Sequence, residues 1–248
     1  MKILVCISSV PDTTAKINFT ADGKEFDKNG VQFVINPHDE YSLSRAVQLQ
    51  ETQGATVTVV TVGDASVEPV MRKALAIGAN DAIRVNANGG DGFIVASQIA
   101  KIAEEGGYDI ILAGKESIDF NGGEVPGFIA AILDYPFING CINLKVDGNT
   151  VEAIRETDNG KDTISVDFPV VIGGQNGLVG DSELKIPNMR GIMSARTKPL
   201  NVIEPNQIDS KLSVAGFKKP AERGSVHMID KDNVAELVKL LHEEAKVI

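Results

Sequence analysis

Short apolar stretches alternate with amphipathic stretches over the first half of the chain. The apolar stretches have the length and β-branched content of buried strands. They are Ile3–Ile7, Thr56–Val62, Ala82–Val85 and Asp109–Ala113. The amphipathic stretches predict helices, at Asp39–Gln53, Val67–Ile77, Phe93–Glu105 and Phe128–Leu133. Strands that alternate with helices pair in parallel through right-handed crossovers, so the pattern predicts a three-layer α/β sheet.

Glycines stand at the ends of three predicted helices. Gly54, Gly78 and the pair Gly106-Gly107 each occupy the position where a left-handed residue commonly ends a helix. They fix where the chain turns back toward the sheet. Parallel sheets of this kind bind ligands beyond the carboxyl ends of their strands, at the point where the strand order reverses.

After residue 140 the pattern changes to short strand-like segments that are separated by turns. Asn143–Val146, Thr150–Glu156 and Thr163–Val166 are separated by the turn sequences Asp147-Gly148-Asn149 and Asp158-Asn159-Gly160, which predicts an antiparallel hairpin meander. Phe168–Ile172 then returns to the core. We therefore expect a domain over residues 1–199 that includes a hairpin extension at about 140–172.

The remainder of the chain is weakly patterned. A glycine- and proline-containing segment at about 175–198 predicts a long irregular loop, which in compact domains is usually functional or a linker. Residues 201–228 look extended, and Asp230–Ala245 predicts an amphipathic helix. We expect residues 200–248 to form a C-terminal arm whose helix packs on another chain or on a distant face of this one, rather than in the central core.

Composition excludes several classes of function. The chain has 24 Lys and Arg against 34 Asp and Glu, a net charge of −10, which argues against nucleic acid or an anionic membrane as the main partner. No apolar run reaches the roughly 18 residues of a transmembrane segment, and no signal peptide is evident, so a cytoplasmic location is expected. Cys6 and Cys141 form no metal-binding pattern, which argues against an iron–sulfur centre or a structural zinc. Redox chemistry would require a bound organic cofactor.

Two short segments could line a nucleotide site. Ser8–Asp12 follows the first strand, where small polar residues let a base or ribose approach the backbone, although it can also be a plain strand exit. In Asn36-Pro37-His38-Asp39-Glu40, Asn36 can cap a helix, Pro37 suits its first position and the acids complement its dipole. That structural reading accounts for the whole motif.

The strongest candidate site is the glycine-rich stretch Gly114–Gly127, which lies between a predicted strand and a predicted helix. Such a turn presents backbone N–H groups and the positive end of the helix dipole, as a phosphate site requires. It matches neither a Walker A loop nor a dinucleotide fingerprint, and an ordinary strand-to-helix turn remains an alternative. Glu124 would repel a phosphate unless its side chain points away.

A further segment, Ile186–Arg196, combines Met and Ile side chains with two arginines in an acidic chain. This mixture suits either an adaptable protein contact or a loop that covers the core. The three histidines, His38, His227 and His242, accompany no nucleophile motif, so catalysis by side chains alone is not expected.

Taken together, these segments resemble the β subunit of the electron transfer flavoproteins, in the order and near the spacing of that family. The matching segments are Lys2–Val5 with Val10–Asp12, Asn36–Glu40, Lys73–Ala79, Gly114–Asp119, Arg155–Gly160, and Pro187-Asn188 with Ile192–Arg196. The resemblance implies an adenine-nucleotide-binding, Rossmann-like domain with a hairpin extension and a C-terminal arm. It also implies a heterodimer with an α subunit, a redox FAD shared with that subunit, and an AMP held in this chain.

The resemblance assigns roles to individual positions. It implies a cofactor-binding set made up of Cys6, Ser8, Thr13, Asn36, His38, Val62, Gly63, Asp119, Asn121, Gly122, Gly123, Glu124 and Val125. Within this set, Thr13 and His38 would face the FAD of the α subunit, and Gly123, Glu124 and Val125 would offer N–H groups to the phosphate. It also implies a loop that docks an acyl-CoA dehydrogenase or a similar flavin dehydrogenase, through Pro187, Met189, Ile192, Met193 and Arg196.

Two departures leave alternatives open. The family usually carries Asp, Thr or Gln side chains where this chain has Asn121-Gly122-Gly123-Glu124, and it has a lysine-rich run where this chain has Arg190, Arg196 and Lys198. A second FAD in place of AMP, in an NADH-linked bifurcating flavoprotein, is one alternative. An ATP-using enzyme or a nucleotide sensor on the same fold is another, although Ser8–Thr13 lacks the glycines of an ATP-wrapping loop.

Overall fold

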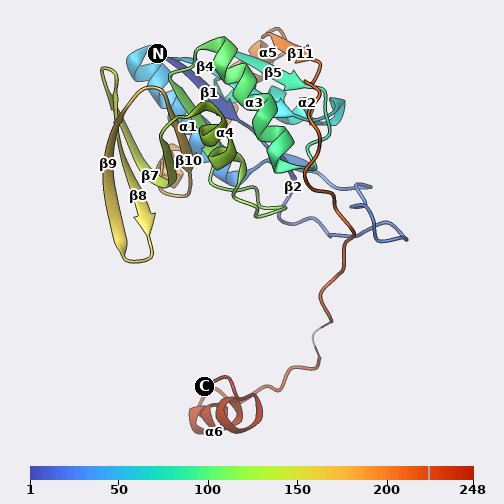
Figure 1. Cartoon of the computed structure of the whole chain (residues 1–248). Helices are drawn as coiled ribbons and strands as arrows, with labels where there is room; N and C mark the ends of the chain where they lie inside the picture. Colours follow the sequence, from blue (N-terminus) through green and yellow to red (C-terminus); the bar gives the residue numbers. More distant parts are fainter. Residues whose placement is uncertain (223) are drawn as a thin grey trace.

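The computed structural model describes residues 1–222 and 224–248. A nine-stranded sheet forms the centre of the molecule, in the order β11-β5-β4-β1-β6-β10-β7-β8-β9 (Figure 1). Its strands are β1 (Lys2–Cys6), β4 (Thr56–Val62), β5 (Asp81–Val85), β6 (Ile110–Gly114), β7 (Phe137–Asp147), β8 (Thr150–Thr157), β9 (Gly160–Asp167), β10 (Val170–Gly174) and β11 (Leu200–Ile203). Pairing is parallel from β11 to β7 and antiparallel from β7 to β9.

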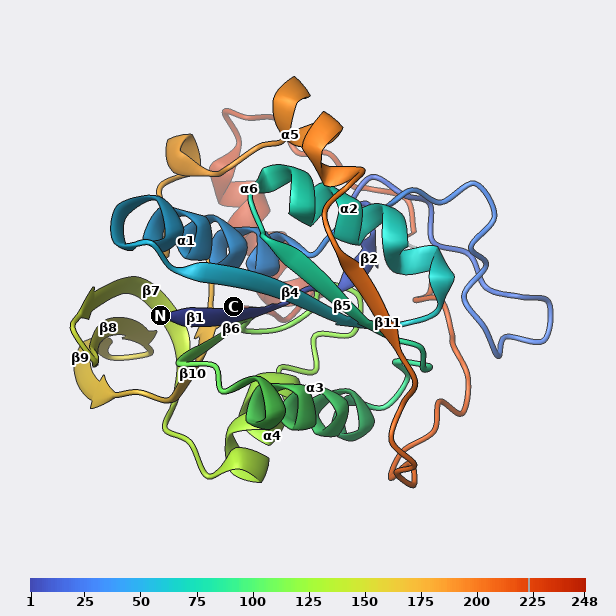
Figure 2. The same ribbon diagram turned by 90° about the horizontal axis from the view of Figure 1, so that it is seen from above.

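Helices cover both faces of the parallel part. Figure 2 shows α1 (Pro37–Gln53) and α2 (Glu68–Ile77) on one face, and α3 (Gly92–Gly106) and α4 (Val125–Leu133) on the other. Because side chains alternate along a strand, Ile3 and Val5 of β1 are buried in the cluster beneath α1 and α2, whereas Leu4 and Cys6 are buried in the cluster beneath α3 and α4. The predicted three-layer α/β class and the hairpin meander are both confirmed.

The smaller elements lie around this sheet. β2 (Ser9–Pro11) and β3 (Phe33–Ile35) pair antiparallel as a separate ribbon. The others are the 3₁₀ turns η1 (Ala65–Val67) and η2 (Asp181–Glu183), the helices α5 (Met189–Ala195) and α6 (Val234–Lys239), and the π-helical turn η3 (Leu240–Glu244). Each helix in the described ranges is too short or too polar to span a lipid bilayer.

The three predicted helix-ending glycines differ in conformation. Gly54 and Gly107 are left-handed, with φ of 69° and 59°, as predicted. Gly78 is not, because its φ is 162°. A Cβ at Gly78 would lie 2.8 Å from both methyl groups of Val47, so this glycine allows α2 to end close against α1.

The segment before residue 204 contains more regular structure than the sequence predicts. Met189–Ala195 forms α5, so the prediction of an irregular loop throughout 175–198 is wrong. Pro187 and Gly191 look like helix breakers, but Pro187 precedes the helix, and Gly191 lies where a Cβ would be 2.2 Å from the carbonyl oxygen of Ala76 in α2. β11 was also not predicted, and by pairing in parallel with β5 it places the start of the arm after Ile203.

The end of the chain leaves the body of the protein. Figure 1 shows an extended segment that carries α6 away from the sheet and its helices. The helix that the sequence predicts over Asp230–Ala245 is present but shorter, because Asn233 caps it by accepting a hydrogen bond from the N–H of Glu236 at 3.3 Å. Its apolar side chains Val234, Leu237 and Val238 are exposed.

The strand order reverses at β1. The chain proceeds from β1 outward to β4 and β5, and then returns to β6 on the other side of β1. The helices change face at the same point, because α1 and α2 precede the return and α3 and α4 flank it. The connections that follow β1 and β6 therefore lead to opposite faces of the sheet. The space between them, beyond the carboxyl ends of these strands, is where such a fold has room for a ligand.

Candidate functional site

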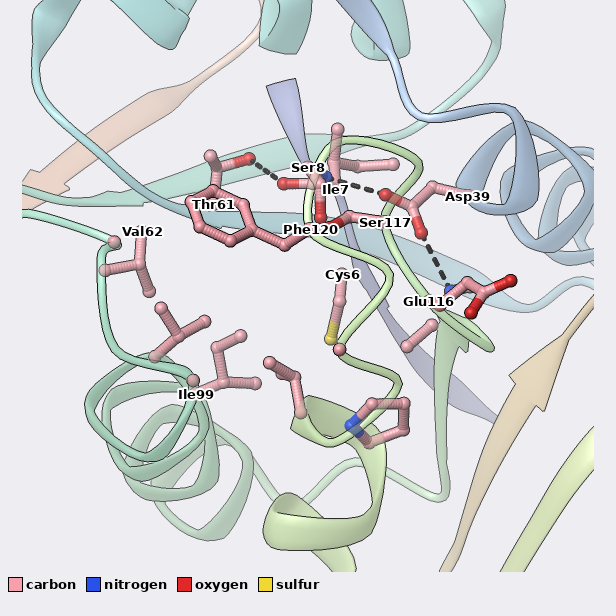
Figure 3. A pocket seen from close by; sticks show the side chains of 18 of the residues that line it. Cys6, Ile7, Ser8, Asp39, Thr61, Val62, Ile99, Glu116, Ser117 and Phe120 are labelled. Carbon is pink, nitrogen blue, oxygen red and sulfur yellow. Dashed lines mark hydrogen bonds between the residues drawn. The ribbon is translucent and has the colours of Figure 1, made fainter. Parts of the chain in front are cut away.

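A cavity of about 330 Å³ opens at this reversal point (Figure 3). Its size is at the small end of the range of small-molecule sites, which is roughly 300–1,000 Å³. Cys6, Val60, Val62, Ile99 and Ala113 give it apolar walls from both sides of β1. An aromatic base or a similar flat apolar group fits such walls.

Asp39 ties together the elements that converge on the cavity. Its carboxylate accepts hydrogen bonds from the backbone N–H of Ser8 after β1, at 2.7 Å, and from that of Gly114 at the end of β6, at 2.8 Å. The side chain is buried, and this burial raises the pKa of Asp39 to about 7 against the pull of the two N–H groups. Its carboxylate also adds to burial in raising the pKa of Cys6, whose thiol therefore stays neutral.

Asn36 positions the loop after β6 rather than capping α1 with its side chain. The helix begins with Pro37 in its first turn, as predicted, but the Asn36 side chain makes no capping hydrogen bond. Its amide nitrogen instead donates to the carbonyl of Glu116 at 2.9 Å, and its oxygen accepts from the N–H of Ile118 at 3.2 Å. The loop that begins at Lys115 is thereby attached to the start of α1.

The N-terminus of α4 faces the cavity without a side-chain cap. Glu124 occupies the cap position but makes no capping hydrogen bond, and Pro126 supplies the rigid first turn. Gly123 is left-handed at φ 64°, a conformation that favours glycine and that turns the backbone toward the cavity. Together with the helix dipole, this arrangement suits an anionic group such as a phosphate.

The side chains around the cavity carry negative charge. Glu116, Asp119 and Glu124 line it, and none of the described lining residues is Lys or Arg. Glu116 is paired with Lys115 at 3.6 Å and lies 3.9 Å from His38. Burial and the charge of Lys115 lower the pKa of His38, so the imidazole is neutral at physiological pH. An anion in this cavity must therefore be held by backbone N–H groups and by hydroxyl groups of the lining, such as those of Ser8, Ser9 and Ser117.

Asp91 joins the rim of the cavity to the C-terminal arm. It caps α3 by accepting from the N–H of Phe93 at 2.8 Å. Its other oxygen accepts from Ser210 Oγ at 2.8 Å, the N–H of Lys211 at 2.6 Å and the N–H of Leu212 at 3.0 Å. These hydrogen bonds lower the pKa of Asp91 well below its usual range. The arm is thus fastened beside the cavity before it leaves the body.

The predicted cofactor-binding residues fall into two groups. Those that line the cavity are Cys6, Ser8, Val62, Asp119, Gly122, Gly123, Glu124 and Val125. Those that lie outside its lining are Thr13, Asn36, His38, Gly63 and Asn121. In this second group, Asn36 and His38 adjoin the cavity through the Glu116 loop, whereas Thr13 is exposed on the loop after β2.

Several lining residues were not predicted from the sequence. Asp39 was interpreted only as a helix-dipole complement, although it also forms part of the cavity wall. Gly89, Gly90 and Gly92 bring the loop before α3 to the rim, and Phe120 lies at the rim with 62% of its surface exposed. The pair Gly89-Gly90 directly before a predicted helix is a glycine-rich signal that could have pointed to this loop.

The predicted partner-binding residues gather around α5. Met189 and Met193 are exposed, whereas Pro187, Ile192 and Arg196 line a groove between α5 and α2. The end of α5 is clamped to α2, because Arg72 Nη1 donates to the carbonyls of Ala195 and Lys198, both at 2.8 Å. The two exposed methionines therefore project from a fixed base.

A methyl group at Gly114 is expected to disturb the hydrogen bonds by which Asp39 holds Ser8 and Gly114. In Gly114→Ala, the new Cβ would lie 2.4 Å from Asp39 Oδ1 and 2.7 Å from the Cβ of His38. We expect the free energy of unfolding to fall by about 1 to 2 kcal/mol, as measured by urea unfolding. In the control Gly90→Ala, the nearest atom lies 3.5 Å away and φ is not in the left-handed region, so we expect little change. Equal stabilities of the two variants would contradict this packing.

Comparison with known proteins identifies the family. The model of the electron transfer flavoprotein domain matches residues 24–208. The chain is 30% identical to the electron transfer flavoprotein subunit beta of Bacillus subtilis over the whole of both chains. It is 33% identical to that of Syntrophomonas wolfei, over 94% of this chain and 92% of the relative, and 31% identical to that of Bradyrhizobium diazoefficiens over all of both. The resemblance seen in the sequence is therefore confirmed, and the chain belongs to the electron transfer flavoprotein β-subunit family.

Proposed function

We propose that this chain, with an α subunit, forms an electron carrier that accepts electrons from flavin dehydrogenases such as acyl-CoA dehydrogenases. In this proposal an FAD shared with the α subunit supplies the redox chemistry when bound. The chain itself holds an AMP with a structural role. The observation that carries the proposal is a small cavity with apolar walls and an uncapped helix N-terminus at the reversal point of a sheet of this family.

The residues of the cavity fit an adenylate. Val62 and Ile99 offer apolar contact to a base, and the backbone around Gly123 offers N–H groups to one phosphate. Asp39 holds the backbone of Ser8 and Gly114 in place at the cavity wall through its two hydrogen bonds, so the site is formed before a ligand enters. A nucleotide that binds only the folded chain would stabilise it by mass action.

The groove beside α5 supports the docking role. Met189 and Met193 are flexible apolar side chains on a short helix whose base is held by Arg72. Such side chains adapt to the surfaces of different partners. Arg196 supplies a cation next to them on an otherwise acidic protein. This arrangement suits contact with the rim of a dehydrogenase.

The proposal is tested by identifying the small molecules that the heterodimer carries. The chain is co-purified with its α subunit, and the material released by denaturation is identified by mass spectrometry. We expect one FAD and one AMP per heterodimer. Two FAD and no AMP would instead support the NADH-linked alternative, and the absence of both flavin and adenine nucleotide would contradict the proposal.

A variant with a filled cavity provides the control. Val62→Phe places a larger side chain in the cavity wall, so the AMP should be lost. The FAD, which the α subunit holds in this proposal, should be retained. Loss of both molecules together, with the heterodimer intact, would show that the cavity is not a separate nucleotide site.

A further inference from the structure

Two helix N-termini border the cavity, but only one of them is open. Glu124, the cap residue of α4, makes no capping hydrogen bond to any described residue. By contrast, α3 is capped by Asp91, whose Oδ1 accepts from the N–H of Phe93. A phosphate group can therefore use the N-terminus of α4, whereas that of α3 is already occupied by a carboxylate of the chain itself.

The side chain of Glu124 closes the space between these two helix ends. Its Oε1 lies so near Gly92, the first residue of α3, that a Cβ on this glycine would be 2.3 Å from it. The carboxylate thus extends from the start of α4 toward the start of α3, along the rim of the cavity. Any ligand group that continues from α4 in this direction meets a negative charge.

The other charges at the cavity do not offset Glu124. Among the described residues, no Lys or Arg lines the cavity, and the nearby Lys115 is paired with Glu116. Asp119 is a further carboxylate in its wall. A first phosphate can be held by the N–H groups of α4, but a second phosphate would find like charges and no cation, which disfavours binding strongly.

We propose that Glu124 restricts the cavity to ligands with a single phosphate group, and that its carboxylate excludes nucleoside diphosphates and FAD. This inference rests on the proposed function, in which the cavity holds an adenylate. It assigns Glu124 the role of a specificity-determining residue. It also gives a reason for the glycine at position 92, where any side chain would displace the carboxylate.

The test measures nucleotide selectivity in the intact heterodimer. The complex is dialysed free of AMP, and the Kd values for AMP and for ADP are measured by calorimetry. Wild-type protein should bind AMP more tightly than ADP. Glu124→Gln keeps the shape and removes the charge, so it should lower this preference by about tenfold, through tighter ADP binding and with little change for AMP.

Glu104→Gln is the matched control, because it also removes one carboxylate, but an exposed one near the carboxyl end of α3 and outside the cavity lining. Its ratio of Kd values should stay close to that of the wild type. An unchanged ratio in Glu124→Gln, an equal change in both variants, or wild-type protein that binds ADP or FAD in the cavity as tightly as AMP would overturn the inference. Wild-type protein that binds neither nucleotide would contradict the proposed function instead.

Discussion

Asp39→Asn is expected to lower the free energy of unfolding by about 2 kcal/mol at pH 5, because an amide can accept with only one of its two polar atoms. In the wild type, both carboxyl oxygens accept from backbone N–H groups, those of Ser8 and Gly114. One of these buried N–H groups would lose its acceptor in the variant and would face an NH₂ group. A buried donor left without a partner costs about 1–3 kcal/mol.

This deficit is expected to depend on pH. Burial raises the pKa of Asp39 from 3.8 to about 7, so between these values the folded chain binds a proton that the unfolded chain has released. The contribution of this group to stability is therefore greatest below about pH 4 and is lost as the pH rises to about 7. A difference of about three pKa units corresponds to about 4 kcal/mol. The amide of the variant does not titrate. The amount by which the variant is less stable than the wild type should therefore shrink as the pH rises, and the variant should become the more stable protein as the pH approaches 8.

Urea unfolding of both proteins from pH 5 to pH 8 measures the difference directly. Taking the difference removes the contributions of the many other carboxylates, including Asp91, whose lowered pKa acts in the opposite direction. Glu40→Gln is the control, because Glu40 is in the same helical turn and pairs with Lys73 at the surface. A deficit in Asp39→Asn that stays constant over this range would show that the pKa of Asp39 is not raised.

Leu237→Asp is expected to weaken association with the α subunit by about 30-fold or more. α6 exposes Val234, Leu237 and Val238, and Figure 1 shows it away from the body of the chain. Such an apolar face is unfavourable in water. Membership of this family implies an α-subunit partner, and we expect that partner to cover the face. Central apolar residues of an interface each contribute about 2 kcal/mol or more. Calorimetric titration of the α subunit with each variant measures the loss.

Glu236→Gln is the matched control, because it changes the charge on the same turn of α6 without altering the apolar face. It should bind the α subunit about as well as the wild type. The melting temperature of the free chain should be the same in both variants, since α6 lies away from the core. If Leu237→Asp bound as tightly as Glu236→Gln, α6 would not be part of the interface.

The sequence predicts most of the sheet because its strands are buried on both faces. Thr56–Val62 is found with its predicted bounds, since a run of β-branched residues is hard to place elsewhere. β11 is different, because Leu200–Ile203 is short and largely exposed, and it becomes a strand only by pairing with the edge of β5. Gly78 is likewise not predictable from the local sequence, since the need for a glycine there comes from the close approach of Val47 in another helix.

The sequence predicts the residues of the site where a local sequence motif indicates their role. The glycine-rich turn before α4 indicates a phosphate site, and Gly122 to Val125 do line the cavity. The role of Asp39 is not visible in the sequence, because its partners Ser8 and Gly114 are distant in the chain and meet it only when β1, β6 and α1 converge. Asn36 illustrates the same point. Its local pattern predicts a helix cap, but its side chain instead donates a hydrogen bond to the carbonyl of Glu116 and holds the loop after β6.

The carboxylate of Asp91 links two processes that are usually considered separately. It holds the start of α3 beside the cavity and, through Ser210 to Leu212, the beginning of the segment that carries α6. Free energies of binding at two coupled sites are reciprocal. We therefore expect a ligand that orders the rim around Gly92 also to favour the arm bound at Asp91, and a subunit that displaces the arm to change how firmly that ligand is held. Assembly and nucleotide binding would then be parts of a single equilibrium.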